Sequence, residues 1–103
     1  MRKPLVLALV IGASLVTIQQ AHAVSFCLET GEKANYRPGG RYTYEEPARG
    51  VTWNGTWTGS PKVGGAVQVT FPNGRLRNDS FVMSEGRVYL VNAGGRRFPG
   101  RFC

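Results

Sequence analysis

The sequence predicts an all-β domain built from antiparallel hairpins, and three observations support this. Glycine is abundant, at 14 of 103 residues, which favours turns and strands over long helices. A spaced pattern of glycine and aromatic residues recurs in the second half of the chain. Hairpin-turn signals at Pro72-Asn73-Gly74 and Ala93-Gly94-Gly95 separate short alternating segments. The length fits one small domain.

The segment 1–23 has the pattern of a secretory signal. Arg2 and Lys3 supply a positive start, an apolar run follows from Leu5 to Ile18, and small residues stand at 21 and 23. We expect cleavage after Ala23. The apolar run is short for a membrane span and no charged stop-transfer cluster follows it, which disfavours an anchor. The sequence therefore predicts a secreted or periplasmic protein with no transmembrane span in its mature chain.

The mature chain, 24–103, carries two cysteines, Cys27 and Cys103, near its two ends. In an oxidising compartment an even number of cysteines indicates disulfides. An intramolecular bridge would close nearly the whole domain and stabilise it by roughly 4 kcal/mol. An intermolecular bridge and free thiols are the alternatives. Because the only histidine is His22, two cysteines are a poor zinc site, and we expect no metal and no cofactor.

The absence of histidine from the mature chain also disfavours catalysis. A Ser-His or Cys-His pair cannot form, and no phosphate-binding glycine loop with a following Lys-Ser/Thr is present. The adjacent Glu45 and Glu46 would point to opposite faces of a strand, which does not suit a glycosidase pair. We expect a non-enzymatic protein. If it were an enzyme, the carboxylates to test would be Glu45, Glu46, Asp79 and Glu85.

Three eight-residue segments share the form Gly-x-x-aromatic-x-Gly-x-aromatic. They begin at Gly50, Gly74 and Gly95, and the second has Arg77 and Asp79 where the others have an aromatic residue and a glycine. Alternate residues of a strand share a face, so a glycine between two rings leaves room for a ring from a neighbouring strand. Core packing is favoured over a ligand platform for these rings. The predicted repeat core is Trp53, Gly55, Trp57, Phe81, Phe98, Gly100 and Phe102.

The other expected strands follow from alternation. Val67, Val69 and Phe71 share one face of a strand, and residues 88–91 form another short strand. We also expect a strand near residues 41–44, within an N-terminal segment, 24–49, that covers or extends the sheet.

The segment 50–102 resembles the MORN repeat, a unit of stacked hairpins. The run Trp53-Asn54-Gly55-Thr56-Trp57 matches the opening of a unit, Gly64-Gly65 its middle, and residues 67–74 its second strand and turn. It departs from the pattern because Ala66 or Val67 replaces a usual glycine, the second unit is degenerate, and the spacing slips. The resemblance implies an elongated hairpin stack that associates with membranes or proteins. An unrelated small β-barrel or sandwich is the alternative.

A linear stack separates its ends, whereas a bridge between the cysteines must join them. The segment 24–49 could run back along the sheet, or the whole domain could close on itself. The sequence therefore predicts either antiparallel stacked hairpins or a small closed β-barrel, stapled by one disulfide.

Positive charge is concentrated in the second half of the mature chain. Residues 24–50 have no net charge, whereas residues 51–103 carry seven basic and two acidic side chains. Arginine binds phosphate and carboxylate in a bidentate manner. The candidate partners are an anionic lipid headgroup, lipopolysaccharide or an acidic protein, and a merely solubilising surface is the alternative. The candidate binding residues are Arg75, Arg77, Arg87, Arg96, Arg97 and Arg101.

Together these features predict an exported, non-enzymatic binding module of MORN-like hairpins. Export disfavours a nucleic-acid partner. The alternative is a periplasmic inhibitor of a hydrolase such as lysozyme, although a basic inhibitor is a poor electrostatic match for a cationic lysozyme.

Overall fold

The computed structural model describes residues 23–103, so the predicted signal segment lies outside the described residues except for Ala23. The described chain forms eight strands and two short 3-10 turns, η2 (Pro38–Gly40) and η3 (Pro47–Arg49). The strands are β1 (Val24–Leu28), β2 (Lys33–Arg37), β3 (Arg41–Glu46), β4 (Val51–Gly59), β5 (Ala66–Thr70), β6 (Leu76–Ser84), β7 (Arg87–Asn92) and β8 (Arg97–Phe102).

The eight strands form a closed antiparallel barrel. Each strand pairs with the next along the chain, and β8 pairs with β1, where Phe26 faces Phe102 and Leu28 faces Gly100. Of the two architectures that the sequence leaves open, the protein adopts the barrel. The segment 24–49 supplies β1, β2 and β3, and so extends the sheet.

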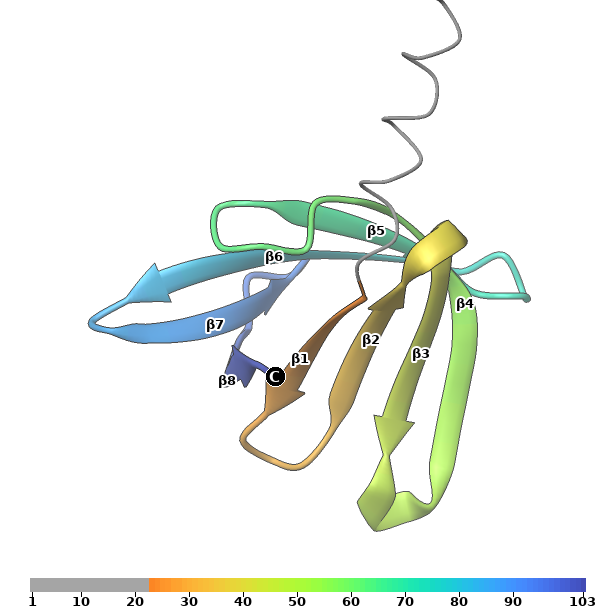
Figure 1. The fold of residues 1–103 in the computed structure, drawn as a ribbon, viewed down its shortest axis with the longest axis horizontal. Coiled ribbons are helices and arrows are strands. Elements are labelled where there is room, and N and C mark those ends of the chain that lie inside the picture. Colours follow the sequence, from red (N-terminus) through yellow and green to blue (C-terminus); the bar gives the residue numbers. More distant parts are fainter. Residues whose placement is uncertain (1–22) are drawn as a thin grey trace, which may run out of the picture.

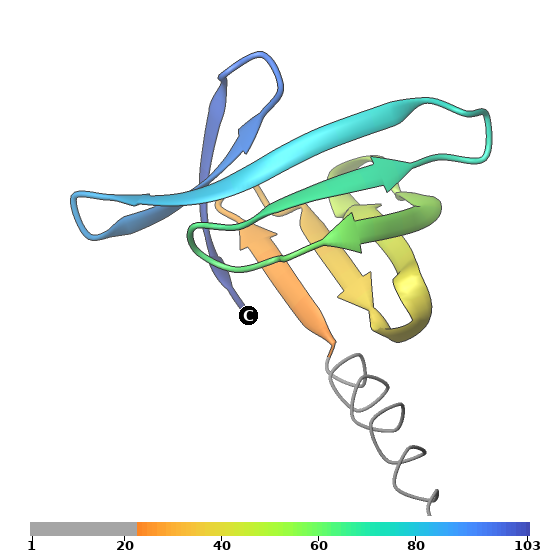
Figure 2. The same cartoon turned by 90° about the horizontal axis from the view of Figure 1, so that it is seen from above.

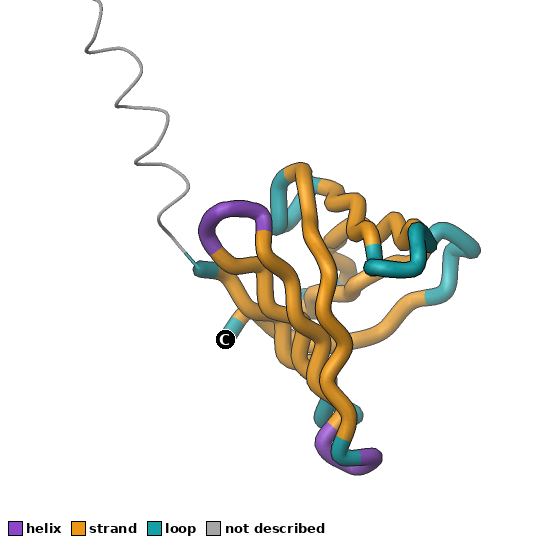
Figure 3. Tube along the Cα trace, turned by 90° about the vertical axis from the view of Figure 1, so that its right-hand side faces the viewer, coloured by secondary structure: helices purple, strands orange, loops and turns teal. Residues whose placement is uncertain are grey.

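The two parts of the barrel cross one another. In Figure 1, β1 to β4 run side by side, and β5, β6 and β7 lie across them. Figure 2, seen from above, shows β5 and β6 passing over the first strands of the chain. Figure 3 shows η2 and η3 at opposite ends of β3, so η3 marks the end of the barrel at which β3 finishes and β4 begins.

The core is built from alternate residues of the strands, as a barrel with one face inward requires. Phe26 lies at its centre, with its ring 5.4 Å from that of Phe81 and 5.1 Å from that of Phe102, edge to face in both cases. The buried apolar residues are Phe26, Leu28, Ala34, Tyr36, Tyr42, Val67, Val69, Phe81 and Leu90.

Both predicted hairpin turns are present, between β5 and β6 and between β7 and β8. Gly74 and Gly95 have φ angles of 86° and 84°, a left-handed conformation that favours glycine. The Asn92 side-chain oxygen accepts hydrogen bonds from the backbone N–H groups of Gly94, at 3.0 Å, and Arg96, at 2.9 Å. Local turn chemistry therefore fixes these two hairpins.

A disulfide joins Cys27 to Cys103, with 5.9 Å between their Cα atoms. The predicted intramolecular pairing is confirmed. The bridge lies at the seam where β8 meets β1, and the C-terminus lies beside β1 in Figure 1. The Cys103 N–H also donates to the Ser25 carbonyl at 3.0 Å.

Candidate functional site

The structure places most of the predicted repeat core against the barrel interior. Phe81 is fully buried, and Trp57, Phe98 and Phe102 are half-buried and pack on the core. Trp53 differs, because it is 45% exposed. Four of the five predicted rings are therefore core material, and Trp53 stands at the rim.

Gly55 and Gly100 lie where a neighbouring strand leaves no room for a Cβ atom. A Cβ atom on Gly55 would come within 2.6 Å of the Thr70 carbonyl oxygen. A Cβ on Gly100 would collide with the Cys27 carbonyl and lie 2.7 Å from the Phe26 ring. At Gly100 a ring from the next strand thus fills the gap that the glycine leaves.

The six candidate arginines fall in three places. Arg87, Arg97 and Arg101 share the outer face of β7 and β8. Arg75 and Arg96 lie on turns, and Arg77 enters the barrel interior.

The first group surrounds a tyrosine. Val88 and Leu90 pack into the core, so Arg87 and Tyr89 point outward from β7. The guanidinium carbons of Arg87 and Arg97 lie 5.9 and 5.6 Å from the centre of the Tyr89 ring, within the range of cation–π attraction. We call Arg87, Tyr89, Arg97 and Arg101 the basic face.

Residues 87–102, which form β7, β8 and their turn, contain no acidic residue. Glu29 approaches the basic face from the turn after β1 and forms an ion pair with Arg87. This pair is exposed on both sides, so water and salt screen it and it contributes little to stability. The outward guanidinium groups of Arg97 and Arg101 form no ion pair within the described chain.

Arg77 belongs to a second cluster, inside the barrel. Its Nε donates to Asp79 Oδ2 at 2.9 Å, and the Asp79 side chain is fully buried. The Arg77 guanidinium carbon also lies 5.2 Å from the centre of the Tyr44 ring. Arg77 is thereby engaged inside the protein and is a poor candidate for contacting an anionic surface.

Tyr36 and Tyr42 complete this interior cluster. They face each other across β2 and β3, with ring centres 5.4 Å apart. Both hydroxyl oxygens and the Asp79 Oδ1 atom are buried, and none of the three has a hydrogen-bond partner among residues 23–103. We call Tyr36, Tyr42, Tyr44, Arg77 and Asp79 the polar cluster.

The electrostatics of the polar cluster show that its members are close together. Burial raises the pKa of Tyr36, Tyr42 and Tyr44, and the charges of Asp79 and Arg77 act on all three hydroxyls in opposite directions. Burial also raises the pKa of the Asp79 carboxyl, while Arg77 partly offsets this effect. The tyrosines are therefore neutral hydroxyl groups over the ordinary pH range.

A pH-dependent stability follows from Asp79. Its pKa in the folded state lies above the ordinary value of 3.8, so protonation favours folding. This contribution is full below the ordinary pKa and is lost as the pH rises through the raised value. We expect the free energy of unfolding of the wild type, relative to Asp79→Asn, to decrease as the pH rises through this window. Urea denaturation of both proteins across a pH series measures the difference.

The variant Arg77→Met provides the control for that prediction. Without the guanidinium the pKa of Asp79 should rise further, so the loss of stability should extend to higher pH and become larger in total. If the difference between the wild type and Asp79→Asn does not change with pH, or if it increases with pH, the expectation is wrong. Arg77 would then stabilise the ionised carboxylate at least as much as burial destabilises it.

Sequence reasoning grouped Arg77 with the surface arginines and did not identify the polar cluster. A signal was nevertheless present. In the degenerate second repeat, Arg77 and Asp79 occupy the positions that hold Phe98 and Gly100 in the third unit, and these two residues face the core. Strand alternation therefore places them inside, as the structure shows.

The carboxylates named as catalytic candidates have separate environments. Glu45 accepts a hydrogen bond from the Asn35 amide at 2.7 Å, and Glu46 accepts from Arg49 at 2.7 Å and from the Trp53 indole at 3.1 Å. Glu85 is exposed in the turn between β6 and β7. Within residues 23–103 there is no group of three metal-ligating side chains.

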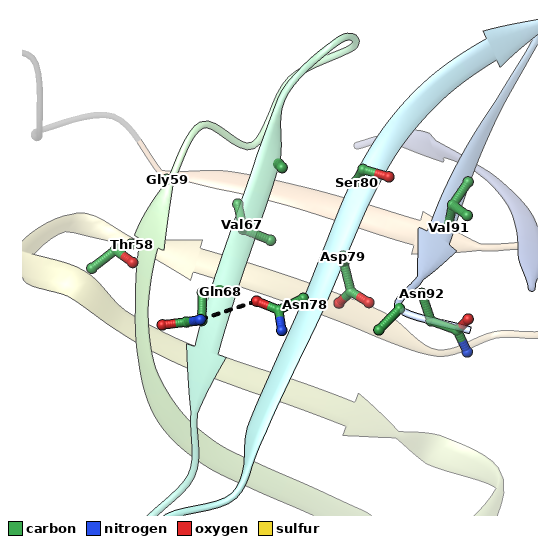
Figure 4. A pocket seen from close by; sticks show the side chains of 11 residues that line it. Thr58, Gly59, Val67, Gln68, Asn78, Asp79, Ser80, Val91 and Asn92 are labelled. Carbon is green, nitrogen blue, oxygen red and sulfur yellow. Dashed lines mark hydrogen bonds between the residues drawn. The ribbon is translucent and has the colours of Figure 1, made fainter. Parts of the chain in front are cut away.

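A shallow depression of about 350 Å³ lies against β4, β5, β6 and β7 (Figure 4). Thr58, Gln68 and Asn78 form a cross-strand row along it, and the Gln68 amide donates to the Asn78 oxygen at 3.1 Å. Asp79 and Ser80 also line it, and as neighbours along β6 their side chains point to opposite faces of the strand. The Asp79 carboxylate is bonded to Arg77, so the lining forms no nucleophile–base pair with Ser80.

In the part of the chain that the structure describes, no helix has the length and apolar character needed to cross a membrane. Comparisons of the chain with protein-family models, with curated proteins and with solved structures found no match.

Proposed function

We propose that this protein is an exported, non-enzymatic binding module that attaches to a phosphate-bearing membrane surface through its basic face. The observation that carries the proposal is the grouping of Arg87, Arg97 and Arg101 on the outer face of β7 and β8. Residues 87–102, which contribute this surface, contain no acidic side chain. Lipid headgroups and lipopolysaccharide share the phosphate group that such a surface would bind.

The arrangement around Tyr89 prepares the arginines for binding. Two guanidinium groups pack near one ring, so each loses less side-chain freedom when it contacts a phosphate. A closed barrel is a rigid support for these groups. Attraction between exposed charges and an anionic surface is screened by salt, which gives the proposal a measurable signature.

Export and kinship with MORN repeats are two further parts of the proposal. The disulfide supports export, because such bridges persist in oxidising compartments. Kinship with MORN repeats rests on the sequence pattern, and the closed barrel differs from the open stack that the resemblance implies.

The test is co-sedimentation of the oxidised chain, 24–103, with vesicles of phosphatidylglycerol or phosphatidylcholine across a salt series. We expect binding to the anionic vesicles only, and its loss as salt is added. Replacing Arg87, Arg97 and Arg101 together with glutamine should weaken binding roughly a hundredfold, at about 1 kcal/mol for each arginine.

A matched control removes the same charge elsewhere. Arg41, Lys62 and Arg75 are exposed and lie away from the basic face, so their replacement with glutamine should leave most of the binding. Equal losses in the two triple variants would mean that net charge alone drives the association. If neither vesicle binds, the membrane proposal is wrong, and inhibition of cell-wall hydrolases becomes the next measurement.

A further inference from the structure

We infer that two copies of this chain associate through an unpaired part of β4, residues 51–55, by pairing this segment antiparallel with its counterpart. β4 pairs with β3 over residues 51–56 but with β5 only over residues 56–59. The side of residues 51–55 that faces away from β3 therefore has no strand beside it within residues 23–103, and we call it the free edge. In Figure 1 this part of β4, near η3, lies at the border of the sheet.

The free edge exists because β5 ends early. Continuing the register of β4 and β5 would place Pro72 opposite Asn54. Proline has no N–H group to donate to a strand ladder. The chain turns back instead, and the Gly74 N–H donates to the Phe71 carbonyl at 2.8 Å. The turn that joins β5 to β6 thus leaves the first half of β4 uncovered.

The backbone groups of Thr52 and Asn54 point toward the free edge. The Ser60 N–H donates to the Ala66 carbonyl at 2.8 Å, in the register of β4 and β5. In an antiparallel ladder every second residue directs its backbone groups to the same neighbour. Counting back from Ser60, the residues that face the β5 side beyond the end of β5 are Asn54 and Thr52. Neither forms a backbone hydrogen bond with a turn or loop among residues 23–103, and both are exposed.

The charge distribution favours a second copy as the occupant of the free edge. The chain 24–103 carries eleven basic and six acidic side chains, so two copies repel one another over most of their surfaces. Residues 50–61 contain no charged side chain. Two copies therefore meet with least repulsion at β4. Its valine, threonine and tryptophan residues also have high strand propensity.

Other strands extend beyond a neighbour, but their free parts carry features that oppose pairing. β6 has no β7 partner over residues 76–78, and Arg77 points inward there. β8 pairs with β1 only from Gly100 onward, and its earlier part contains Arg97 and Pro99. Inward charges, surface charges and proline are the usual means by which strand edges avoid association. The free edge of β4 has none of them.

The backbone geometry also selects a register. With a two-fold axis at Trp53, Thr52 of each copy faces Asn54 of the other, and both pairs can exchange N–H···O=C bonds, four in all. An axis at Thr52 or Asn54 would allow only two such bonds. The two Trp53 side chains then lie on one face with Cβ atoms about 4.5–5.5 Å apart. Trp53 is 45% exposed in the single chain, so this contact would cover it.

The first experiment is sedimentation velocity of the oxidised chain, 24–103, over a protein concentration series. We expect a reversible shift from monomer to dimer at high concentration. The dimer should be weak, because a segment of this length is much smaller than the roughly 20–30 residues a side of a standard interface. Salt screens the repulsion between copies, so added salt should strengthen dimerisation, the opposite of its effect on vesicle binding. A monomer at every concentration and salt level would overturn the inference.

Amide hydrogen exchange locates the contact. In dilute protein we expect rapid exchange at Thr52 and Asn54, and slow exchange at Trp53 and Gly55, whose backbone groups face β3. In concentrated protein exchange at Thr52 and Asn54 should also become slow. A dimer that forms without this change would use another surface and would contradict the inference.

A matched pair of variants tests the same point. Thr52→Lys and Thr58→Lys add the same charge to exposed positions on one face of β4, but Thr58 lies where β5 covers the strand. Across the two-fold axis the Thr52→Lys side chains would be diagonal neighbours about 7–8 Å apart, so this variant should dimerise roughly fivefold more weakly. Thr58→Lys should dimerise like the wild type. Equal dissociation constants for the two variants would overturn the inference.

Asn54→Pro removes an N–H group from the free edge of each copy, and so two of the four hydrogen bonds. It should weaken dimerisation roughly tenfold or more. The missing N–H points away from β3, so pairing of β3 with β4 should be retained. None of these variants alters the basic face, so all three should bind anionic vesicles as the proposed membrane attachment requires. Loss of dimerisation and loss of vesicle binding are therefore separate results.

Discussion

The double variant Cys27→Ser/Cys103→Ser will be less stable than the oxidised wild type by roughly 4 kcal/mol. The bridge joins residues that are 76 positions apart, so it removes much of the conformational freedom of the unfolded chain. It also ties β8 to β1 at the seam that closes the barrel. Denaturation by urea, monitored by tryptophan fluorescence, measures the difference.

Reduced wild type provides the control for the disulfide, because it lacks the bridge but keeps both cysteine side chains. We expect its unfolding midpoint to match that of the double variant. A loss below about 1 kcal/mol in both proteins would mean that the unfolded chain is already compact and gains little freedom without the bridge.

Gly100→Val will destabilise the protein by about 1–3 kcal/mol or more, the usual cost of overpacking a core. The added atoms collide with the Cys27 carbonyl and with the Phe26 ring, which itself packs on Phe81 and Phe102. Neither neighbour can move freely, because one is backbone in a paired strand and the other is fully buried. Gly55→Val should behave similarly, since its Cβ would lie 2.6 Å from the Thr70 carbonyl oxygen.

Gly94→Ala is the matched control for these substitutions. Gly94 has no positive φ angle, and the nearest atom to an added Cβ is the Asn92 side-chain oxygen at 3.5 Å. We expect its thermal midpoint to stay close to that of the wild type. Unchanged midpoints for Gly55→Val and Gly100→Val would show that the strands separate at these points at little cost.

Local patterns predicted the strands well. The strand expected at 67–71 corresponds to β5 (Ala66–Thr70), and that expected at 88–91 lies within β7 (Arg87–Asn92). The turn signals that separate them depend on residues adjacent in sequence, so they could be recognised without the fold. Closure could not be decided in this way, because the pairing of β1 with β8 joins opposite ends of the chain. Only the two cysteines pointed to it.

The candidate sites were harder to predict for a related reason. The basic face depends on strand alternation within β7 and β8, which a local pattern supplies. The polar cluster combines Tyr36 and Tyr42 from the hairpin of β2 and β3 with Arg77 and Asp79 from β6, across the interior. Their proximity follows from barrel geometry rather than from any short motif. For Trp53 the local pattern was misleading. Its position in the repeat predicted core packing, but on β4 it is 45% exposed.

Closure of the barrel also limits how other chains can attach to this one. Each of the eight strands has a paired neighbour on both sides, so a further strand can be added only where one strand extends beyond its neighbour. β4 has such an overhang, because it pairs with β3 over residues 51–56 but with β5 only over residues 56–59. Where the backbone N–H and C=O groups face a paired strand on both sides, a partner must be recognised through side chains. This directs attention to the arginines around Tyr89.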